Sequence, residues 1–285
     1  MPKNLFLVFF LMMSCATTPP ASQTSPTIRV AIQKEPLVIK EIPLEAYLMG
    51  VLAKEVLPDW PLETLKAQAV ASRTYTLYRK EHPRSPEENF DIEVTVQDQV
   101  FALQEEYPPL ITQAVQETAG QILQYDGKVF AAFYHSTCGG ISEPAESVWS
   151  GEAPFPVNQI HPDPFCEDSP HSHWSYELDK ENEGRIEILK RNETGRVALL
   201  DFQSHEVSGN SFREMIGYQK IRSTLFEVEE EKDRILLSGR GSGHGVGLCQ
   251  WGAKGMGDLG YTYQEILEFY YPGATLKNPP LNPPL

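Results

Sequence analysis

Two apolar stretches near the N-terminus decide the fold: Leu44-Glu-Ala-Tyr-Leu-Met-Gly-Val-Leu-Ala-Lys-Glu-Val56 and Leu65-Lys-Ala-Gln-Ala-Val-Ala-Ser-Arg-Thr-Tyr75. In the first, apolar side chains recur at positions 44, 48, 51 and 52, which is the spacing of one helix face. Pro58 ends this helix, and Pro61 opens a second that runs to about residue 80 before Pro83. The pattern predicts a pair of helices.

Short strands dominate elsewhere. We expect them at 27–33, 36–40, 92–96, 100–103, 121–125, 129–135, 185–189, 197–207 and 234–238, with further helices at 109–118 and 263–269. Because the helices cluster instead of alternating with strands, the sequence predicts an α+β fold of mostly antiparallel strands with an N-terminal helical pair.

Composition sets the protein class. The chain has 285 residues, 41% hydrophobic and 22% charged, which suits a globular protein with a real core. Its formal net charge of -15 would repel a phosphate backbone over most of the surface. We therefore expect no nucleic-acid partner.

The first residues read as an export signal. Lys3 is followed by an apolar run over 5–13, too short to span a bilayer, and then by Ser14-Cys15-Ala16. Leu-Met-Met-Ser-Cys resembles a bacterial lipobox with Cys15 as the lipidated residue; the alternative is a cleaved secretory signal with an incidental cysteine. In both cases the protein leaves the cytoplasm. The lipid anchor would keep it in the cell envelope, and Ala16 favours the periplasmic side of an outer membrane if the cell has one. The expected divisions are a signal at 1–15, a disordered tether at 16–27, a folded domain at 28–275 and a proline-rich tail at 276–285.

Glu55 is the candidate catalytic residue. It follows the apolar stripe by three and four residues, so the helix points a carboxylate where a core side chain is expected. Burial there raises a carboxyl pKa, which suits a general acid; the alternative is a solvent-exposed or ion-paired glutamate. Lys66 and Arg73 share a face of the second helix and could form an ion-pair network or bind a hydroxyl-rich substrate. The spacing of Lys66 and Arg73 does not decide between an ion-pair network and substrate binding.

Two glycine-rich motifs follow: His135-Ser-Thr-Cys-Gly-Gly140 and Gly239-Arg-Gly-Ser-Gly-His-Gly-Val-Gly-Leu-Cys-Gln-Trp-Gly-Ala253. Glycine at this density allows tight turns and close backbone approach to a ligand. Neither motif matches a nucleotide-binding loop. Together with the two helical stretches, and in the same order, they resemble the stage II sporulation protein D family, which includes the amidase-enhancer proteins.

The resemblance implies a function in the cell wall. In that family the glutamate matching Glu55 is the catalytic acid of a lytic transglycosylase that acts on peptide-free peptidoglycan, and the positions matching Lys66, Arg73 and Thr137 line a glycan-binding cleft. Two departures are that Ser242 replaces a common tryptophan and that 91–97 lacks the cysteine and histidine with which some members bind zinc.

A single carboxylate suits this mechanism, because the C6 hydroxyl of the sugar replaces the second carboxylate of most glycosidases. Glu55 would protonate the leaving oxygen and then accept the proton from O6, while Trp149 or Trp251 stacks on sugar. A non-catalytic enhancer that binds glycan and stimulates a cell-wall amidase is the alternative. The complete expected substrate-binding set is Lys66, Arg73, His135, Ser136, Thr137, Trp149, His244, Gln250 and Trp251.

The cysteines after the signal are odd in number. We expect a disulfide between Cys138 and Cys166, a buried Cys249 and no cofactor. The alternative is zinc held by His135, Cys138, Cys166 and one further histidine, drawn from His161, His171 and His173. A thiol hydrolase using Cys249 with His244 or His135 is a third reading, and iodoacetamide sensitivity would reveal it.

Lipidation at Cys15 can be tested by one substitution. Cys15→Ser should leave the domain folded but release it from the membrane fraction, because the lipid on that residue is the only anchor expected. Carbonate-washed membranes, probed for the wild type and the variant, provide the measurement. Retention of the variant in those membranes would disprove the lipobox interpretation.

Overall fold

The computed structural model describes residues 26–278 apart from 86, 96–97, 150–159 and 180–184. The signal, Cys15, nearly all of the tether and residues 279–285 of the tail lie outside this part, so their assignments stay predictions. Within the described ranges, no helix combines the length and apolarity needed to cross a membrane.

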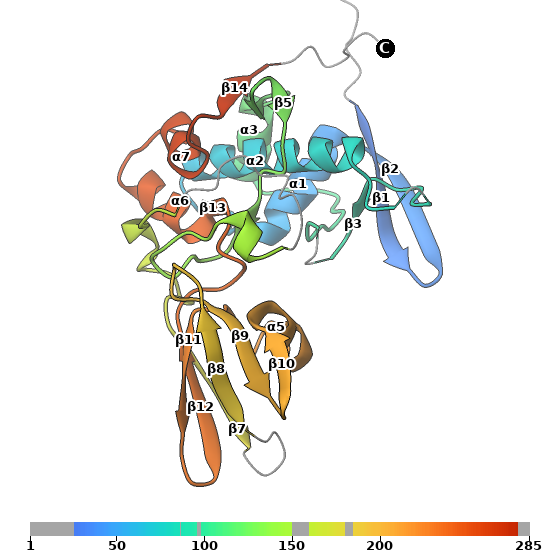
Figure 1. Ribbon diagram of the computed structural model, residues 1–285. Helices are drawn as coiled ribbons and strands as arrows, with labels where there is room; N and C mark the ends of the chain where they lie inside the picture. The colour runs from blue at the N-terminus through green and yellow to red at the C-terminus, as the bar shows by residue number, and fades with distance from the viewer. Residues whose placement is uncertain (1–25, 86, 96–97, 150–159, 180–184, 279–285) are drawn as a thin grey trace, which may run out of the picture.

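The predicted helical pair is present. α1 (Leu44–Glu55) and α2 (Leu62–Glu81) pack against each other and against α3 (Pro109–Glu117). A proline precedes the first residue of α1 and of α2, where the missing N–H costs no helical hydrogen bond. Beside them lies the hairpin of β1 (Thr27–Lys34) and β2 (Leu37–Pro43), to which β3 (Ile92–Glu93) adds in parallel (Figure 1).

A second layer covers the other side of α2. It contains α6 (Gln250–Asp258) and α7 (Tyr263–Tyr270), both in contact with α2, and the sheet of β14 (Thr275–Lys277), β4 (Ile122–Tyr125) and β5 (Lys128–Val129). Below it, β6 (Tyr134–His135) pairs in parallel with β13 (Leu248–Cys249). This pairing joins the two glycine-rich motifs.

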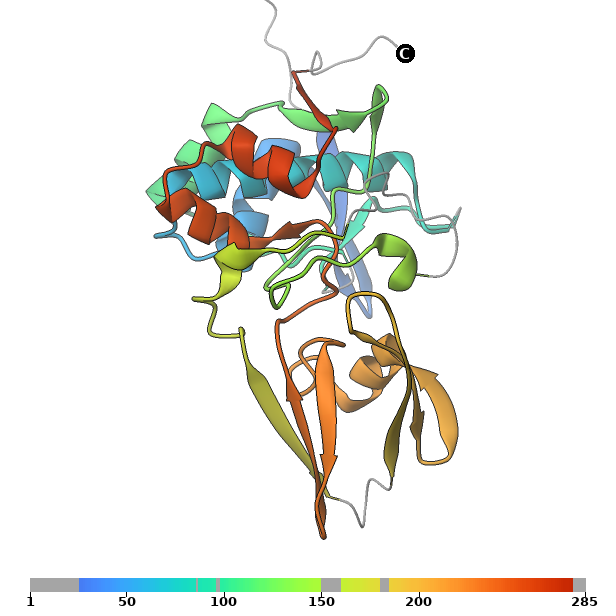
Figure 2. The same cartoon turned by 60° about the vertical axis from the view of Figure 1, so that its left-hand side comes forward.

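The strands from Trp174 to Gly239 build a separate small lobe (Figures 1 and 2). Its two antiparallel sheets consist of β7 (Trp174–Asp179), β11 (Phe226–Glu230) and β12 (Arg234–Gly239), and of β8 (Ile186–Arg191), β9 (Val197–Phe202) and β10 (His205–Ser208). α5 (Gly209–Ile216) packs on the second sheet, and the apolar side chains of the lobe form their own core cluster.

The fold class is confirmed: helices and small, mostly antiparallel sheets make an α+β protein. Several element boundaries differ from the prediction. The strand expected over 197–207 is the β9–β10 hairpin, which turns at Gln203 and Ser204, both with positive φ. Residues 100–103 form no strand, β14 runs beyond 275, and the second glycine-rich motif leads directly into α6.

Arg73 ties the helices together. Its side chain is fully buried and makes two hydrogen bonds to the Glu45 carboxylate, at 3.0 and 2.6 Å. Its remaining N–H groups reach backbone carbonyls, including those of Gln121 at 3.1 Å and Val115 at 3.4 Å. Such a planar, bidentate pair is the geometry that arginine favours in an interior. Arg73 therefore cross-links α1, α2 and the end of α3.

Removing this arginine should destabilise the fold. Arg73→Met leaves Glu45 without its partner, and the loss of one member of a buried pair typically costs about 3 to 5 kcal/mol. The matched control is Arg185→Met, whose pair with Glu187 is exposed and should change stability by less than about 1 kcal/mol. Urea unfolding measures both, and equal midpoints for the two variants would contradict the structural assignment.

Candidate functional site

Glu55 is the last residue of α1, and its carboxylate has two hydrogen-bond donors from distant segments. The backbone N–H of Val100 donates to Oε1 at 3.0 Å, and Gln250 Nε2 donates to Oε2 at 3.3 Å. Gly50 makes the first contact possible, because a Cβ there would overlap the Phe101 ring that packs on α1. The site thus draws on α1, on the segment after β3 and on the start of α6.

Burial dominates the electrostatics of Glu55. It raises the pKa of the carboxyl above its ordinary value, and the hydrogen bonds from Val100 and Gln250, which favour the charged form, oppose this only in part. Tyr134 lies close enough to Glu55 for the two groups to interact electrostatically. Burial, followed by the Glu55 charge, raises the pKa of Tyr134 well above its usual value. A carboxyl group in this setting holds a proton at higher pH than an exposed one and can donate it.

A buried polar network supports the segment that supplies Val100. Gln99 Oε1 accepts hydrogen bonds from the Tyr47 hydroxyl at 3.0 Å and the Thr76 hydroxyl at 2.8 Å, and Gln99 Nε2 donates to the Tyr134 hydroxyl at 3.0 Å. These contacts fix the backbone beside Glu55. Sequence reasoning identified neither Gln99 nor Tyr134; the only signal was that Tyr134 directly precedes the first glycine-rich motif.

The two glycine-rich motifs form one unit at Glu55. Beyond the β6–β13 pair, the Trp251 N–H donates to the Ser136 carbonyl at 3.0 Å, and Thr137 and Ser242 exchange backbone hydrogen bonds at 2.9 and 2.8 Å. Thr137 itself is buried, with its hydroxyl 2.6 Å from that of Ser169. This arrangement positions Gln250 at the carboxylate.

Aromatic side chains lie at two places on this unit. Trp149 is 36% exposed and stacks on Phe133, with ring centroids 4.4 Å apart, and His244 lies 5.1 Å from the Trp149 ring. Trp251 packs edge-on against Trp60 at 5.1 Å. Trp149 therefore presents an accessible ring, whereas part of Trp251 is covered.

His135 and His244 are neutral. Burial, followed by the neighbouring His244, lowers the pKa of His135 well below its usual value, and burial lowers the pKa of His244 to about 3. The Nδ1 atom of His135 lies 3.1 Å from the Val246 carbonyl, while its Nε2 has no hydrogen-bond partner in the described part of the chain. Neither ring can act as a cation toward a substrate.

Lys66 and Arg73 are held in ion pairs. Lys66 Nζ lies 2.8 Å from Glu63 and 2.7 Å from Glu117, while Arg73 is buried against Glu45 in the first turn of α1. Ten residues of helix, about 15 Å, separate that turn from Glu55. Both residues thus form ion pairs, and the fully buried Arg73 has no surface with which to line a glycan cleft. The contact of Lys66 with glycan stays a prediction.

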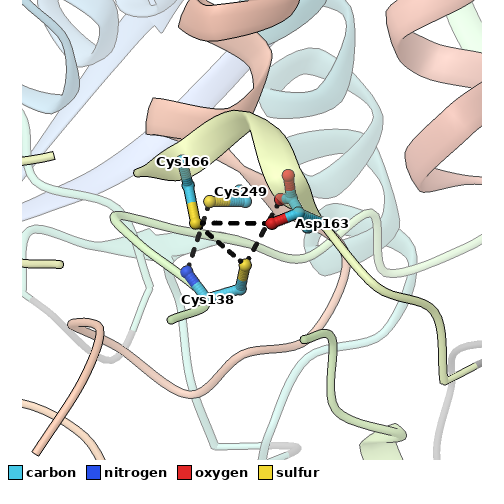
Figure 3. A group of neighbouring side chains, drawn as sticks. All are labelled: Cys138, Asp163, Cys166 and Cys249. Carbon is cyan, nitrogen blue, oxygen red and sulfur yellow. Dashed lines mark hydrogen bonds between the residues drawn. The ribbon is translucent and has the colours of Figure 1, made fainter. Parts of the chain in front are cut away.

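The predicted disulfide partners lie side by side without a bond between them, so the disulfide stays a prediction. Cys138, Cys166 and Cys249 are free and buried, and the Cys138 and Cys166 sulfurs lie 3.5 Å apart (Figure 3). The group they form contains Asp163, not His135 or His161. Burial also raises the pKa of the Cys249 thiol well above its usual value, opposite to the shift that a cysteine nucleophile needs.

A surface hollow of about 590 Å³ lies elsewhere, beside Trp174, Phe226 and Gly239 at the top of the small lobe. It is not at Glu55. The glycan-binding cleft expected at Glu55 stays a prediction.

Comparison with known proteins identifies the family. The profile described as stage II sporulation protein matches residues 33–125. An uncharacterized protein of Brachyspira hyodysenteriae is 33% identical over 253 residues, which cover 84% of this chain and 68% of that protein. The chain belongs to the stage II sporulation protein D family. The family predicted from the four motifs is therefore confirmed.

Two further relatives carry descriptive names. The stage II sporulation protein D of Bacillus subtilis is 28% identical, with 92% of this chain and 84% of that protein aligned. The amidase enhancer of Bacillus subtilis is 29% identical over 80% of this chain. The chain spans only 40% of the amidase enhancer.

The electrostatics of this sporulation protein D site predict a titration. The pKa of the Glu55 carboxyl should lie above that of an ordinary glutamate, and Gln250→Ala should raise it further, because the lost amide favoured the charged form. Carbon-detected NMR of labelled glutamate gives both values, with Glu55→Gln assigning the signal. Gln113→Ala, which removes an exposed donor to Glu117 on α3, should leave the signal unchanged. A lowered pKa in Gln250→Ala would contradict the assignment.

Proposed function

We propose that this protein cleaves the glycan strands of peptidoglycan as a lytic transglycosylase, with Glu55 as the catalytic carboxylate. The observation that carries the proposal is the environment of Glu55: a carboxyl with a raised pKa, held by one backbone N–H and one amide where the family motifs meet. A transglycosylase needs only one such carboxyl, because the same group serves both proton transfers.

The mechanism uses Glu55 twice. Protonated Glu55 donates to the glycosidic oxygen, and the bond from the anomeric carbon to that oxygen breaks. The C6 hydroxyl of the same sugar then forms a bond to the anomeric carbon, and Glu55 accepts its proton. No water is consumed, and the product ends in 1,6-anhydro-N-acetylmuramic acid. The Val100 N–H and the Gln250 amide stabilise the carboxylate present between the two transfers.

Other residues would bind the strand. Trp149 offers an exposed, stacked ring that suits the face of a sugar. Ser136 and His244 are partly exposed on the same unit and can supply hydrogen-bonding groups. Arg73 is assigned to the fold instead, because it is fully buried against Glu45. Lys66, whose pairs with Glu63 and Glu117 are partly exposed, stays a candidate for binding the strand.

We further propose that the protein acts in the cell envelope, anchored by lipid at Cys15, on strands from which the stem peptides have been removed. The relative named amidase enhancer supports a second candidate: glycan binding that stimulates a cell-wall amidase. That function does not need Glu55 as an acid, so the same substitution separates the two.

The reaction predicts a specific product. Incubated with peptide-free glycan strands, the protein should release fragments with anhydro ends, and Glu55→Gln should lower the rate by at least about a hundredfold to ten-thousandfold while folding is retained. Mass spectrometry detects the ends, since each is one water lighter than a hydrolysed reducing end. The matched control is Glu105→Gln, an exposed glutamate on the segment that follows Val100, which should keep full activity.

Two outcomes would overturn the mechanism. Fragments with ordinary reducing ends would keep glycan cleavage but exclude attack by the C6 hydroxyl. Amidase stimulation that persists in Glu55→Gln, without any fragments from the wild type, would establish the enhancer function instead.

A further inference from the structure

Three cysteines and one aspartate from separate segments converge in the core (Figure 3). Cys138 follows β6, and Cys249 ends β13. Asp163 precedes the short 3-10 helix Pro164–Cys166, and Cys166 is the last residue of that helix. All four are buried, and their ligand atoms lie within 4.8 Å of one another. We propose that Cys138, Cys166, Cys249 and Asp163 bind one zinc ion.

The spacing of the donor atoms suits a single tetrahedral ion. With Zn–S bonds of about 2.3 Å and a Zn–O bond of about 2.1 Å, two thiolates around zinc stand about 3.8 Å apart, and a thiolate and a carboxylate oxygen about 3.6 Å. The Cys138 and Cys166 sulfurs are 3.5 Å apart, and the Cys138 sulfur is 3.3 Å from Asp163 Oδ2. These two distances would each have to lengthen by only about 0.3 Å to match tetrahedral coordination.

The surroundings orient these ligands and offset their charge. The backbone N–H groups of Cys138 and Gly252 point at the Cys249 sulfur, at 3.2 and 3.3 Å. The Tyr270 hydroxyl donates to Asp163 Oδ2 at 2.9 Å, and Arg196 donates to the Cys138 carbonyl at 2.7 Å. Partners of this kind fix ligand orientation at metal sites. They also counter the negative charge of three thiolates and a carboxylate around a divalent ion.

A disulfide between Cys138 and Cys166 explains less of this arrangement. It would involve two of the four groups and remove the Cys138 thiol, which donates to Asp163 at 3.3 Å. The buried Asp163 carboxylate would then face a sulfur pair that has no proton to donate, and Cys249 would remain an uninvolved thiol. An ion at the centre gives all four side chains a role.

The donor set also indicates which role the ion has. Sulfur-rich sites with one carboxylate suit zinc, and a site with four protein ligands has no open position for a substrate. All four ligands are almost inaccessible to solvent. The ion would join the first glycine-rich motif, the 3-10 helix and the start of α6. This inference is independent of the proposed glycan cleavage, because it rests on other side chains.

The test is metal analysis of the full chain extracted from membranes in mild detergent. Plasma mass spectrometry should find about one zinc per chain. Cys166→Ser and Cys249→Ser should each lose most of it, and cobalt substituted into the wild type should show sulfur-to-cobalt charge-transfer absorption. Asp163→Asn, which keeps the side-chain shape, should bind zinc at least tenfold more weakly in chelator competition. The matched controls are His161→Asn and His173→Asn, neighbours outside the group, which should retain the ion.

Other results would overturn the proposal. Metal-free wild type with an intact mass two hydrogens lower and only Cys249 titratable after denaturation would establish the disulfide. Iron with acid-labile sulfide would establish a cluster in place of a single ion, and loss of zinc from a histidine variant would require a different ligand set. If a cysteine variant fails to fold, chelator treatment of the wild type decides: zinc release should lower the melting temperature, and an unchanged melting temperature with no metal in the filtrate counts against the site.

Discussion

The parallel pairing of β6 with β13 is the contact on which the rest of the site depends. It is only two residues long on each side, yet it joins positions more than a hundred residues apart in the chain. Closing so long a loop costs conformational entropy, and the pair is too short to offset that cost alone. The adjoining backbone bonds of Ser136 and Thr137 and the surrounding apolar cluster supply the remainder.

The register of the β6–β13 pair positions residues of both the Glu55 site and the cysteine group. With Cys249 opposite His135, the next residue, Gln250, extends to Glu55, while the Cys249 sulfur lies on the opposite side, beside the Cys138 amide. Because Gln250 begins α6 directly after Cys249, a shift of this pairing by one residue would displace both side chains from their partners. The carboxylate and the thiol group are therefore fixed by the same few backbone contacts, although they share no side chain.

The helical pair and the position of Glu55 at the end of α1 were predictable from local patterns. Contacts between residues far apart in the sequence were not. The apolar spacing of α1 and its proline boundaries are properties of one segment, so the sequence predicts them directly, together with the partial burial of Glu55 at the end of the helix. The sequence did not predict the partners of Arg73, because Glu45 lies 28 positions away on another helix. Asp163 carried no sequence signal, because only folding brings its carboxylate to three cysteines. The zinc alternative considered from the sequence used histidines instead. The small lobe was partly missed since its strands are half-exposed and interrupted by turns at residues such as Ser204.

The small lobe begins and ends at neighbouring points. Trp174, the first residue of β7, is paired with Gly239, the last residue of β12, and the apolar core of the lobe is its own. A segment with adjoining ends can lengthen, shorten or change its surface during evolution without moving the chain on either side. Natural selection could therefore reshape this lobe for different cell walls while Glu55, Gln250 and the cysteines kept their mutual positions.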